Sequence, residues 1–209
     1  MTDKEFKFQY ALGALSKKDL GDIAKHTTSK YILTTLSKDK NRSARCLVAG
    51  NKSTPVNILT TLSKDEKRLV RSWVAYNPNA PKKVLTKLAK EKYGDIRYCV
   101  AANSNTPLEV LTKLSKDKND TVKCYIAENS STPIDILTKL SKDKNRNIRS
   151  YVAGNPSTPV EVLTKLSKDK DYYVRYNVAN NSNTPADIVA TFLDDKEAVN
   201  KTGLGPLHE

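Results

Sequence analysis

The chain repeats a block of 26 residues six times without a gap, and this period limits what the chain can fold into. The repeat is clearest at a set of prolines, each preceded by threonine except the second, which follows Ala80: Pro55, Pro81, Pro107, Pro133, Pro159 and Pro185. A fixed period of this length is typical of a solenoid, whose small repeats bury their apolar faces only by stacking on one another. Such a stack offers a long surface and no deep pocket, so the sequence favours a binding scaffold over an enzyme.

Each repeat is predicted to fold as two short helices joined by a polar turn. In the repeat that begins at Pro133, we expect Thr132 to cap the first helix and Pro133 to be its first helical residue. Asp135 stands where a capping box has its acidic member, and Leu137 and Leu140 fall on one apolar face. The first helix is therefore expected to begin at the Thr-Pro step.

The second helix of this repeat places Ile148 and Val152 on one inward face. Asn155 is expected to end the helix, because asparagine tolerates the left-handed conformation common at helix ends. Both helices are too short to be stable alone in water. We therefore predict an all-α fold, an α-solenoid of about seven helix-pair repeats wound into a right-handed superhelix.

The repeat also predicts how the chain is organised. Six complete repeats occupy 29–184, and a shortened, degenerate version at 1–28 is expected to be an N-terminal cap. A further copy departs into an acidic run, so 185–202 is expected to be a C-terminal capping repeat with a polar outer face. Residues 203–209 are expected to be a loose tail.

The motif VAGNPSTPVEVLTKLSKDKDYYVRYNVANNSNTP, from Val152 to Pro185, resembles the leucine-rich repeat variant, a helical family similar to HEAT repeats. The residues that carry the resemblance are V-A-x-N-x-x-T-P, then L-x-x-L, then D-x-x-x-x-V-R. The resemblance implies short helices alternating in a superhelix, and it leaves the function open. Some members hold an iron–sulfur centre on N-terminal cysteines. This chain has no cysteine before Cys46, so no cofactor is expected.

Two charged columns recur with the period and are offset by six residues. The acidic column is Asp39, Asp65, Glu91, Asp117, Asp143 and Asp169. The basic column is Arg45, Arg71, Arg97, Lys123, Arg149 and Arg175. In HEAT-like repeats an acid and an arginine at this offset tie neighbouring repeats together, because a guanidinium can bond several acceptors at a partly buried seam. We expect such a structural ladder, since an acid accompanies every base; the alternative is an arginine ladder that binds phosphates.

The second helix varies between repeats and carries large aromatic residues, whereas the first helix hardly changes. In stacked helix pairs the second helix commonly lines the concave side, which solenoids use for binding. Tyrosine and tryptophan there suit the hot spots of a protein interface, and they also stack on bases of a single strand. The candidate partner-binding residues are Arg68, Trp73, Tyr76, Tyr98, Tyr125, Arg146, Tyr151, Tyr172, Tyr173 and Tyr176. We expect a protein partner on this face; the alternative is that these side chains pack between repeats.

A complete lysine column lies at the turn between the two helices. Its members, the candidate phosphate-binding residues, are Lys38, Lys64, Lys90, Lys116, Lys142 and Lys168. Stacked repeats would draw them into a basic stripe, and with a net charge of +13 the chain could bind nucleic acid without reading its sequence. A solvated, solubilising surface explains the same lysines, and acids are interleaved in these turns.

No catalytic or metal-binding arrangement is predicted. The two histidines, His26 and His208, have neither a nucleophile nor a metal cluster near them in the sequence, and the three cysteines are scattered over separate repeats. No stretch is apolar enough for a signal peptide or a membrane span, so we expect a cytoplasmic protein that does not enter a membrane. The acidic run near the C-terminus opposes end-to-end stacking, so we expect a monomer.

Overall fold

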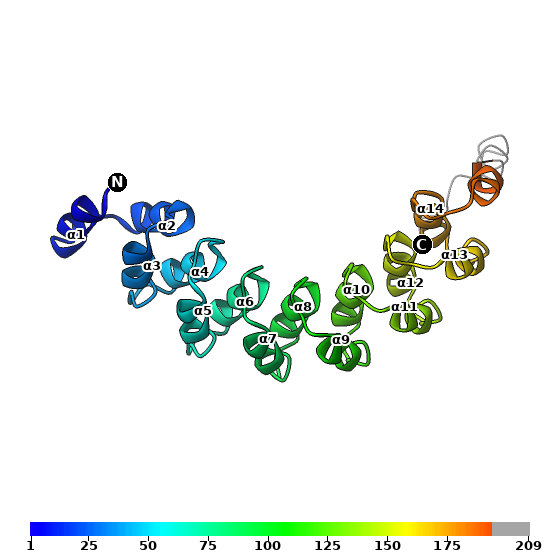
Figure 1. The fold of residues 1–209 in the computed structure, drawn as a ribbon, viewed down its shortest axis with the longest axis horizontal. Helices are drawn as coiled ribbons and strands as arrows, with labels where there is room; N and C mark the ends of the chain where they lie inside the picture. Colours follow the sequence, from blue (N-terminus) through cyan, green and yellow to red (C-terminus); the bar gives the residue numbers. More distant parts are fainter. Residues whose placement is uncertain (194–209) are drawn as a thin grey trace. The chain divides into compact units, whose positions relative to one another are not determined.

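The computed structural model describes residues 1–193, which form α-helices joined by short turns, with no β-strand among them (Figure 1). The chain divides into two compact units: the N-terminal unit is Met1–Val110, and the C-terminal unit begins at Leu111. The predicted all-helical repeat fold is confirmed. The acidic run and the tail predicted from the sequence lie outside the described residues.

The helices alternate in length along the repeats. The N-terminal unit contains α1 (Asp3–Ala11), α2 (Lys17–His26), α3 (Lys30–Leu36), α4 (Arg42–Gly50), α5 (Val56–Leu62), α6 (Arg68–Tyr76), α7 (Lys82–Leu88) and α8 (Gly94–Ala102). Helix α9 (Leu108–Leu114) contains the boundary between the units. The C-terminal unit contains α10 (Asp120–Glu128), α11 (Ile134–Leu140), α12 (Arg146–Gly154), α13 (Val160–Leu166) and α14 (Tyr172–Ala179). Residues 186–193 are also helical.

Apolar residues of both helices form the core of each repeat. In α5 the side chains of Leu59 and Leu62 are buried, and α6 adds Val70 and Val74. Helices of 7 and 9 residues are marginal alone, so burial against their neighbours stabilises them.

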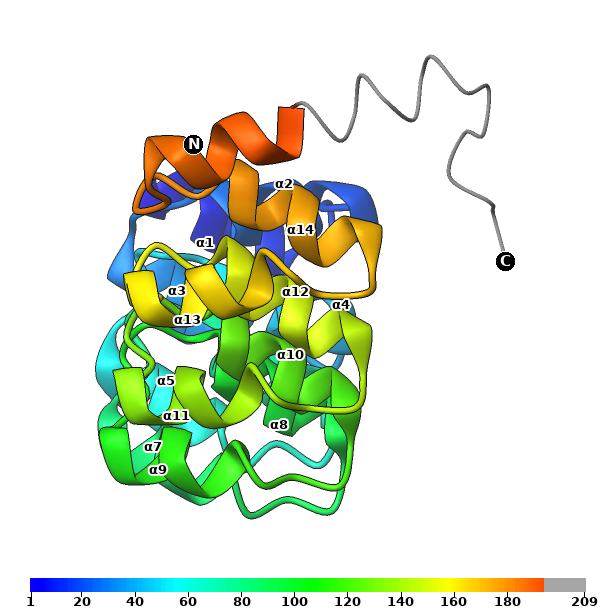
Figure 2. The same ribbon diagram turned by 90° about the vertical axis from the view of Figure 1, so that its right-hand side faces the viewer.

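The even-numbered and odd-numbered helices form separate rows in each unit (Figures 1 and 2). The even-numbered helices pack directly on one another: α2, α4, α6 and α8 in the N-terminal unit, and α10, α12 and α14 in the C-terminal unit. The odd-numbered helices pack mainly on the even-numbered ones. We call the solvent-exposed side of the even-numbered helices the second-helix face.

The predicted cap at the Thr-Pro step is wrong. Helix α11 begins at Ile134, Pro133 precedes it, and this helix start has no side-chain cap. The Thr132 hydroxyl instead donates to the carbonyl of Ile126, at 2.6 Å. This carbonyl lies in the last turn of α10, where backbone oxygens lack helical partners, so the hydroxyl satisfies the helix before it. Asp135 is not part of a capping box and pairs with Lys139 at 3.2 Å. The same backward bond recurs at four further threonines: Thr54, Thr106, Thr158 and Thr184.

The asparagine that ends each second helix does not adopt the left-handed conformation. Asn155 does end α12, as predicted, but its φ of −74° is that of extended backbone. Its side chain is buried, and Nδ2 donates to the carbonyls of Ala127 (2.6 Å) and Asn129 (3.1 Å) in the preceding repeat. Its Oδ1 accepts from the Ser157 N–H at 2.8 Å. The same backward bonds are made by Asn51, Asn77, Asn103 and Asn181. We call these five residues the asparagine ladder.

Residues 1–28 contain a helix pair with two capping boxes, Thr2 with Glu5 and Ser16 with Asp19. The Tyr10 hydroxyl of α1 donates to Asp39 Oδ2 at 2.5 Å and so joins this pair to the first complete repeat. This bond, and the burial of the ring beside the carboxylate, raise the pKa of Tyr10 to about 12. That these residues act as a cap stays a prediction.

Candidate functional site

The charged columns form bonds between successive repeats. Arg45 donates from Nε and Nη2 to both carboxylate oxygens of Asp65 in the next repeat, at 2.7 and 3.1 Å. Its Nη1 donates to the carbonyl of Asp39 in its own repeat, at 2.9 Å. The same forward pairs are Arg71–Glu91, Lys123–Asp143 and Arg149–Asp169. Among the described residues, these side chains are engaged with protein groups, which leaves little of them for a ligand.

Two ladder carboxylates titrate below their ordinary range. Burial raises the pKa of Asp169, but bonds from Arg149 and from the backbone N–H of Asp171 outweigh it, so the pKa is lowered. Asp65 behaves in the same way, with bonds from Arg45 and from the Lys67 N–H. Both carboxylates are therefore ionised at neutral pH, and neither can serve as a general acid there.

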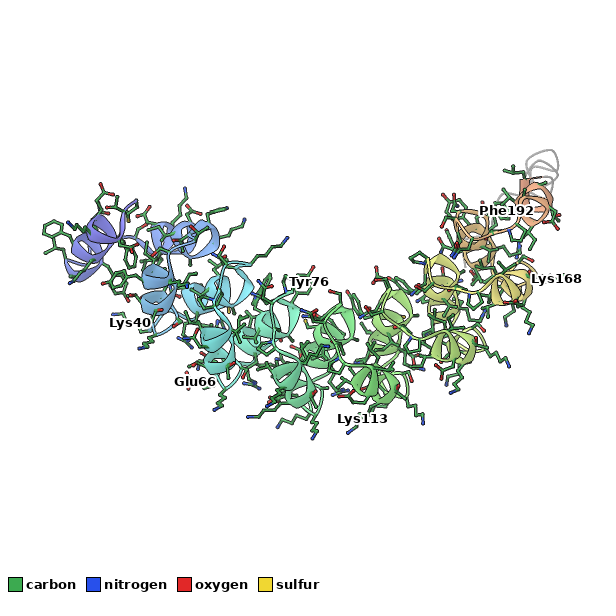
Figure 3. All side chains as sticks on the ribbon, viewed as in Figure 1. Lys40, Glu66, Tyr76, Lys113, Lys168 and Phe192 are labelled. Atoms are coloured by element: carbon green, nitrogen blue, oxygen red, sulfur yellow. The ribbon has the colours of Figure 1, made fainter. Side chains whose placement is uncertain are left out.

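The six lysines of the turn column are all exposed. In the N-terminal unit, Figure 3 shows Lys40 and Glu66 of these turns on the side away from Tyr76, which lies on the second-helix face. The basic turns and the aromatic side chains therefore occupy different surfaces, and one ligand contacting both would have to reach around the helices.

On the second-helix face of the N-terminal unit, the aromatic residues partly cover one another. Trp73 and Tyr76 lie edge to face with ring centroids 6.1 Å apart, and they are 40% and 60% exposed. The Trp73 ring also covers Gly50 of the preceding repeat so closely that a Cβ there would lie 3.0 Å from Cε3. Arg68 pairs with Asp95 at 3.1 Å, and Tyr98 is half-buried. In this part of the face, Trp73 therefore packs on the repeat before it and on Tyr76.

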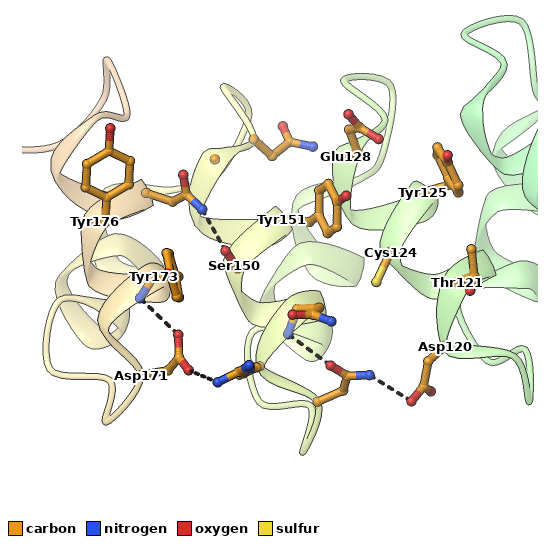
Figure 4. Close-up of a pocket in the computed structure, with 16 residues that line it drawn as sticks. Asp120, Thr121, Cys124, Tyr125, Glu128, Ser150, Tyr151, Asp171, Tyr173 and Tyr176 are labelled. Atoms are coloured by element: carbon orange, nitrogen blue, oxygen red, sulfur yellow. Dashed lines mark hydrogen bonds and ion pairs between the residues drawn. The ribbon is translucent and has the colours of Figure 1, made fainter. Parts of the chain in front are cut away.

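The second-helix face of the C-terminal unit is hollowed into a groove of about 920 Å³ between α10, α12 and α14 (Figure 4). It brings together half of the predicted partner-binding residues: Tyr125, Arg146, Tyr151, Tyr173 and Tyr176. Tyr172 does not line it; its ring stacks on Tyr176 and also contacts Phe192. The remaining candidates, Arg68, Trp73, Tyr76 and Tyr98, belong to the N-terminal unit.

The acidic residues of the groove were not among the predicted partner-binding residues, whereas Arg146 was. Asp171 accepts from the Tyr173 N–H at 3.0 Å through one oxygen and from Arg146 Nη1 at 3.3 Å through the other. Asp120 pairs with Lys123 at 2.7 Å and accepts from Asn145 Nδ2 at 2.9 Å. These bonds hold α10, α12 and α14 in register along the floor of the groove.

Comparison of equivalent positions in the repeats explains where the groove opens. Position 154 is glycine, as is position 50, yet a Cβ at Gly154 would meet nothing within 4 Å. The residue that would cover it, equivalent to Trp73, is Asn177, and this shorter side chain turns away to donate to Ser150 Oγ at 2.6 Å. The sequence contains both differences, but only the packing shows that Gly154 and Asn177 together leave the space open.

The described residues contain no group of three or more His, Cys, Asp or Glu side chains that could hold a metal ion. Cys46 and Cys99 are buried, and burial raises the pKa of the Cys99 thiol to about 12. Cys124 lines the groove, and burial raises its thiol pKa as well. No helix within 1–193 is both long and apolar enough to cross a membrane.

The solved structure of a leucine-rich repeat variant, described as having a novel repetitive structural motif, matches 90% of this chain and 74% of its own, with a TM-score of 0.60 and 22% identity. The chain has the fold of the leucine-rich repeat variant. An engineered protein also matches, with a TM-score of 0.47 and 17% identity over 94% of this chain and 73% of its own. No family model and no curated protein matches the sequence. The likeness to the leucine-rich repeat variant confirms the predicted fold and, at this identity, carries nothing about function.

Proposed function

We propose that this chain is a non-enzymatic binding scaffold that recognises a protein partner on its second-helix face. The observation that carries the proposal is the groove over α10, α12 and α14, lined by four tyrosines on a frame of paired charges. Tyrosine supplies large, rigid contact area with a polar tip and is enriched at the centres of protein interfaces. Tyr151 and Tyr173 are 42% and 52% exposed, so a ligand can reach their rings.

The frame supports this reading because it holds the helices through side chains other than the groove tyrosines. The asparagine ladder and the arginine–acid pairs fix the spacing of the helices without using the tyrosines. A binding site held by neighbouring rigid elements loses little entropy when it is occupied.

The test begins with a random-peptide phage library selected on the immobilised full chain, followed by affinity measurement of synthetic peptides by fluorescence anisotropy. We expect Tyr151→Ala to weaken binding by about tenfold or more, as removal of a hot-spot ring does. Lys142→Glu, in the turn, is the control and should leave the affinity unchanged at moderate salt. Selected peptides that bind Tyr151→Ala as tightly as the parent chain would overturn the proposal.

The second candidate is sequence-independent binding of nucleic acid through the lysine column. It is favoured by the net charge of +13 and by the exposure of all six lysines. Labelled single- and double-stranded DNA and RNA are titrated at low and at moderate salt. A phosphate binder loses affinity steeply as salt rises, and the triple change of Lys116, Lys142 and Lys168 to Glu should abolish binding. This outcome would make nucleic acid the leading function.

A further inference from the structure

The groove of the C-terminal unit contains one carboxylate that the protein itself does not use. Three carboxylates line it, on Asp120, Glu128 and Asp171, against one guanidinium, on Arg146. Asp120 and Asp171 are held by Lys123 and Arg146. Glu128 is exposed and has no hydrogen-bond or ion-pair partner among the described residues. In a chain of net charge +13, the available charge inside this groove is therefore negative.

Glu128 lies among tyrosine rings. Tyr125 and Glu128 are three residues apart on α10 and so share a helix face. Figure 4 shows Glu128 above the groove floor, with the Tyr125 ring on one side and the Tyr151 ring on the other. Burial raises the pKa of Tyr151, and the negative charge of Glu128 adds to the rise.

The space beside this cluster is open because of Gly154 and Asn177. The equivalent space in the N-terminal unit, over Gly50, is filled by the Trp73 ring. The equivalent glycine positions thus differ: Gly50 is covered by an aromatic ring, and a Cβ at Gly154 would meet nothing within 4 Å. The empty position adjoins Tyr151 and Tyr176, so a ligand side chain entering there would contact aromatic surface.

We propose that this groove binds an extended segment of a protein partner through a lysine or arginine side chain, whose cation lies between the Tyr125 and Tyr151 rings and against Glu128. A tyrosine face attracts a cation through its quadrupole, and a nearby carboxylate adds a direct ionic attraction. The groove spans three helices, so Tyr173 and Tyr176 contact the residues that flank the basic one. The inference rests on the proposed function and names the chemistry of its partner.

The charge of the groove argues against other occupants. A phosphate backbone would place its anions against Glu128, and the one guanidinium that lines the groove, on Arg146, already pairs with Asp171. A purely apolar segment would cover the Glu128 carboxylate and remove it from water without a partner, which is unfavourable. A basic side chain is the occupant that satisfies both the rings and the carboxylate.

The experiment uses the full chain and the phage-selected peptides. We expect lysine or arginine to be enriched at one peptide position, and Glu128→Gln to weaken binding about two- to fivefold, the range for an exposed ion pair. Replacing that peptide residue by uncharged norleucine should cost more, because it removes the attraction to the rings as well as the ionic attraction. The two changes together should cost no more than norleucine alone, because norleucine already removes the interaction that Glu128→Gln removes. Glu161→Gln, an exposed carboxylate on α13, is the matched control and should have no effect.

Asn177→Trp separates this inference from the proposed function. The substitution rebuilds the Trp73–Gly50 packing already present in the chain and should close the groove. Circular dichroism checks that the variant is folded. If Asn177→Trp abolishes peptide binding while Glu128→Gln and norleucine have no effect, or have independent effects, the cationic occupant is refuted and the proposed groove stands. If neither Asn177→Trp nor Tyr151→Ala changes binding, both proposals fall.

Discussion

Removal of one member of the asparagine ladder should destabilise the stack far more than its size suggests. Asn155→Ala deletes three hydrogen bonds, those with the carbonyls of Ala127 and Asn129 and with the Ser157 N–H. The Asn129 carbonyl keeps a second donor, the Thr132 N–H at 2.9 Å, whereas the Ser157 N–H loses its bond to Asn155 Oδ1. An unsatisfied buried backbone group costs about 1–3 kcal/mol, so with one group still partly satisfied we expect a loss of about 2–4 kcal/mol.

Urea denaturation followed by circular dichroism measures this loss as a shift of the midpoint at constant slope. Asn147→Ala is the matched control, because Asn147 is an exposed asparagine on the same helix; surface changes of this kind stay within about 0.5 kcal/mol. Equal midpoints for the two variants would refute the reasoning that the ladder holds the repeats together. A changed slope or two separate transitions would instead show that the stack had lost its cooperativity at this junction.

Three further predictions concern the charged contacts. Arg149→Ala should lower the free energy of unfolding by about 2–4 kcal/mol, because Asp169 would remain largely buried without its bidentate partner. The control is Lys139→Ala, which removes an exposed ion pair within one helix. Equal shifts of the urea midpoint in the two variants would contradict the prediction. Folding lowers the pKa values of Asp65 and Asp169, so the two carboxylates stabilise the folded state fully above the ordinary carboxyl pKa of about 4 and lose this effect as the pH falls through their lower folded values. Urea midpoints should therefore drop below pH 4, and they should drop less in Asp65→Asn. A midpoint that does not change with pH would refute this. The pKa of Tyr10 is raised to about 12, so its bond to Asp39 stabilises α1 below pH 10 and is lost as the pH rises through 12. Tyr10→Phe should speed amide hydrogen exchange in α1 at neutral pH and leave exchange in α12 unchanged. Unaltered exchange in α1 would show that the bond is dispensable.

The helices and their inward faces could be predicted from the sequence because they depend on local spacing. Leu137 and Leu140 are buried as their period indicates, and so are Ile148 and Val152. The hydrogen bonds of the turns could not be predicted in the same way. Thr132 fits a cap on the following helix equally well, and only the path of the chain turns its hydroxyl back to Ile126.

The candidate site was predictable in its aromatic residues and not in its shape. The variable positions of the second helix predicted Tyr125, Tyr151, Tyr173 and Tyr176, which line one groove. Whether a ring lines open space or covers a neighbour depends on residues in two successive repeats at once, as Trp73 on Gly50 shows. The residues at one position of the repeat do not show what the next repeat places against them. For the same reason Glu128 was not predicted as a site residue.

Within each unit, successive repeats are joined by bonds that run in two opposite directions. The arginine of one repeat extends forward to the acid of the next, as Arg149 does to Asp169, while the asparagine extends back to carbonyls of the one before, as Asn155 does to Ala127. A repeat is thus complementary to a copy of itself on the side of the repeat before it and on the side of the repeat after it. Duplicating or deleting one whole repeat would recreate correctly bonded junctions on either side. The exposed residues of the second helices remain free to diverge afterwards, so a gene of this design can lengthen first and acquire a new ligand later.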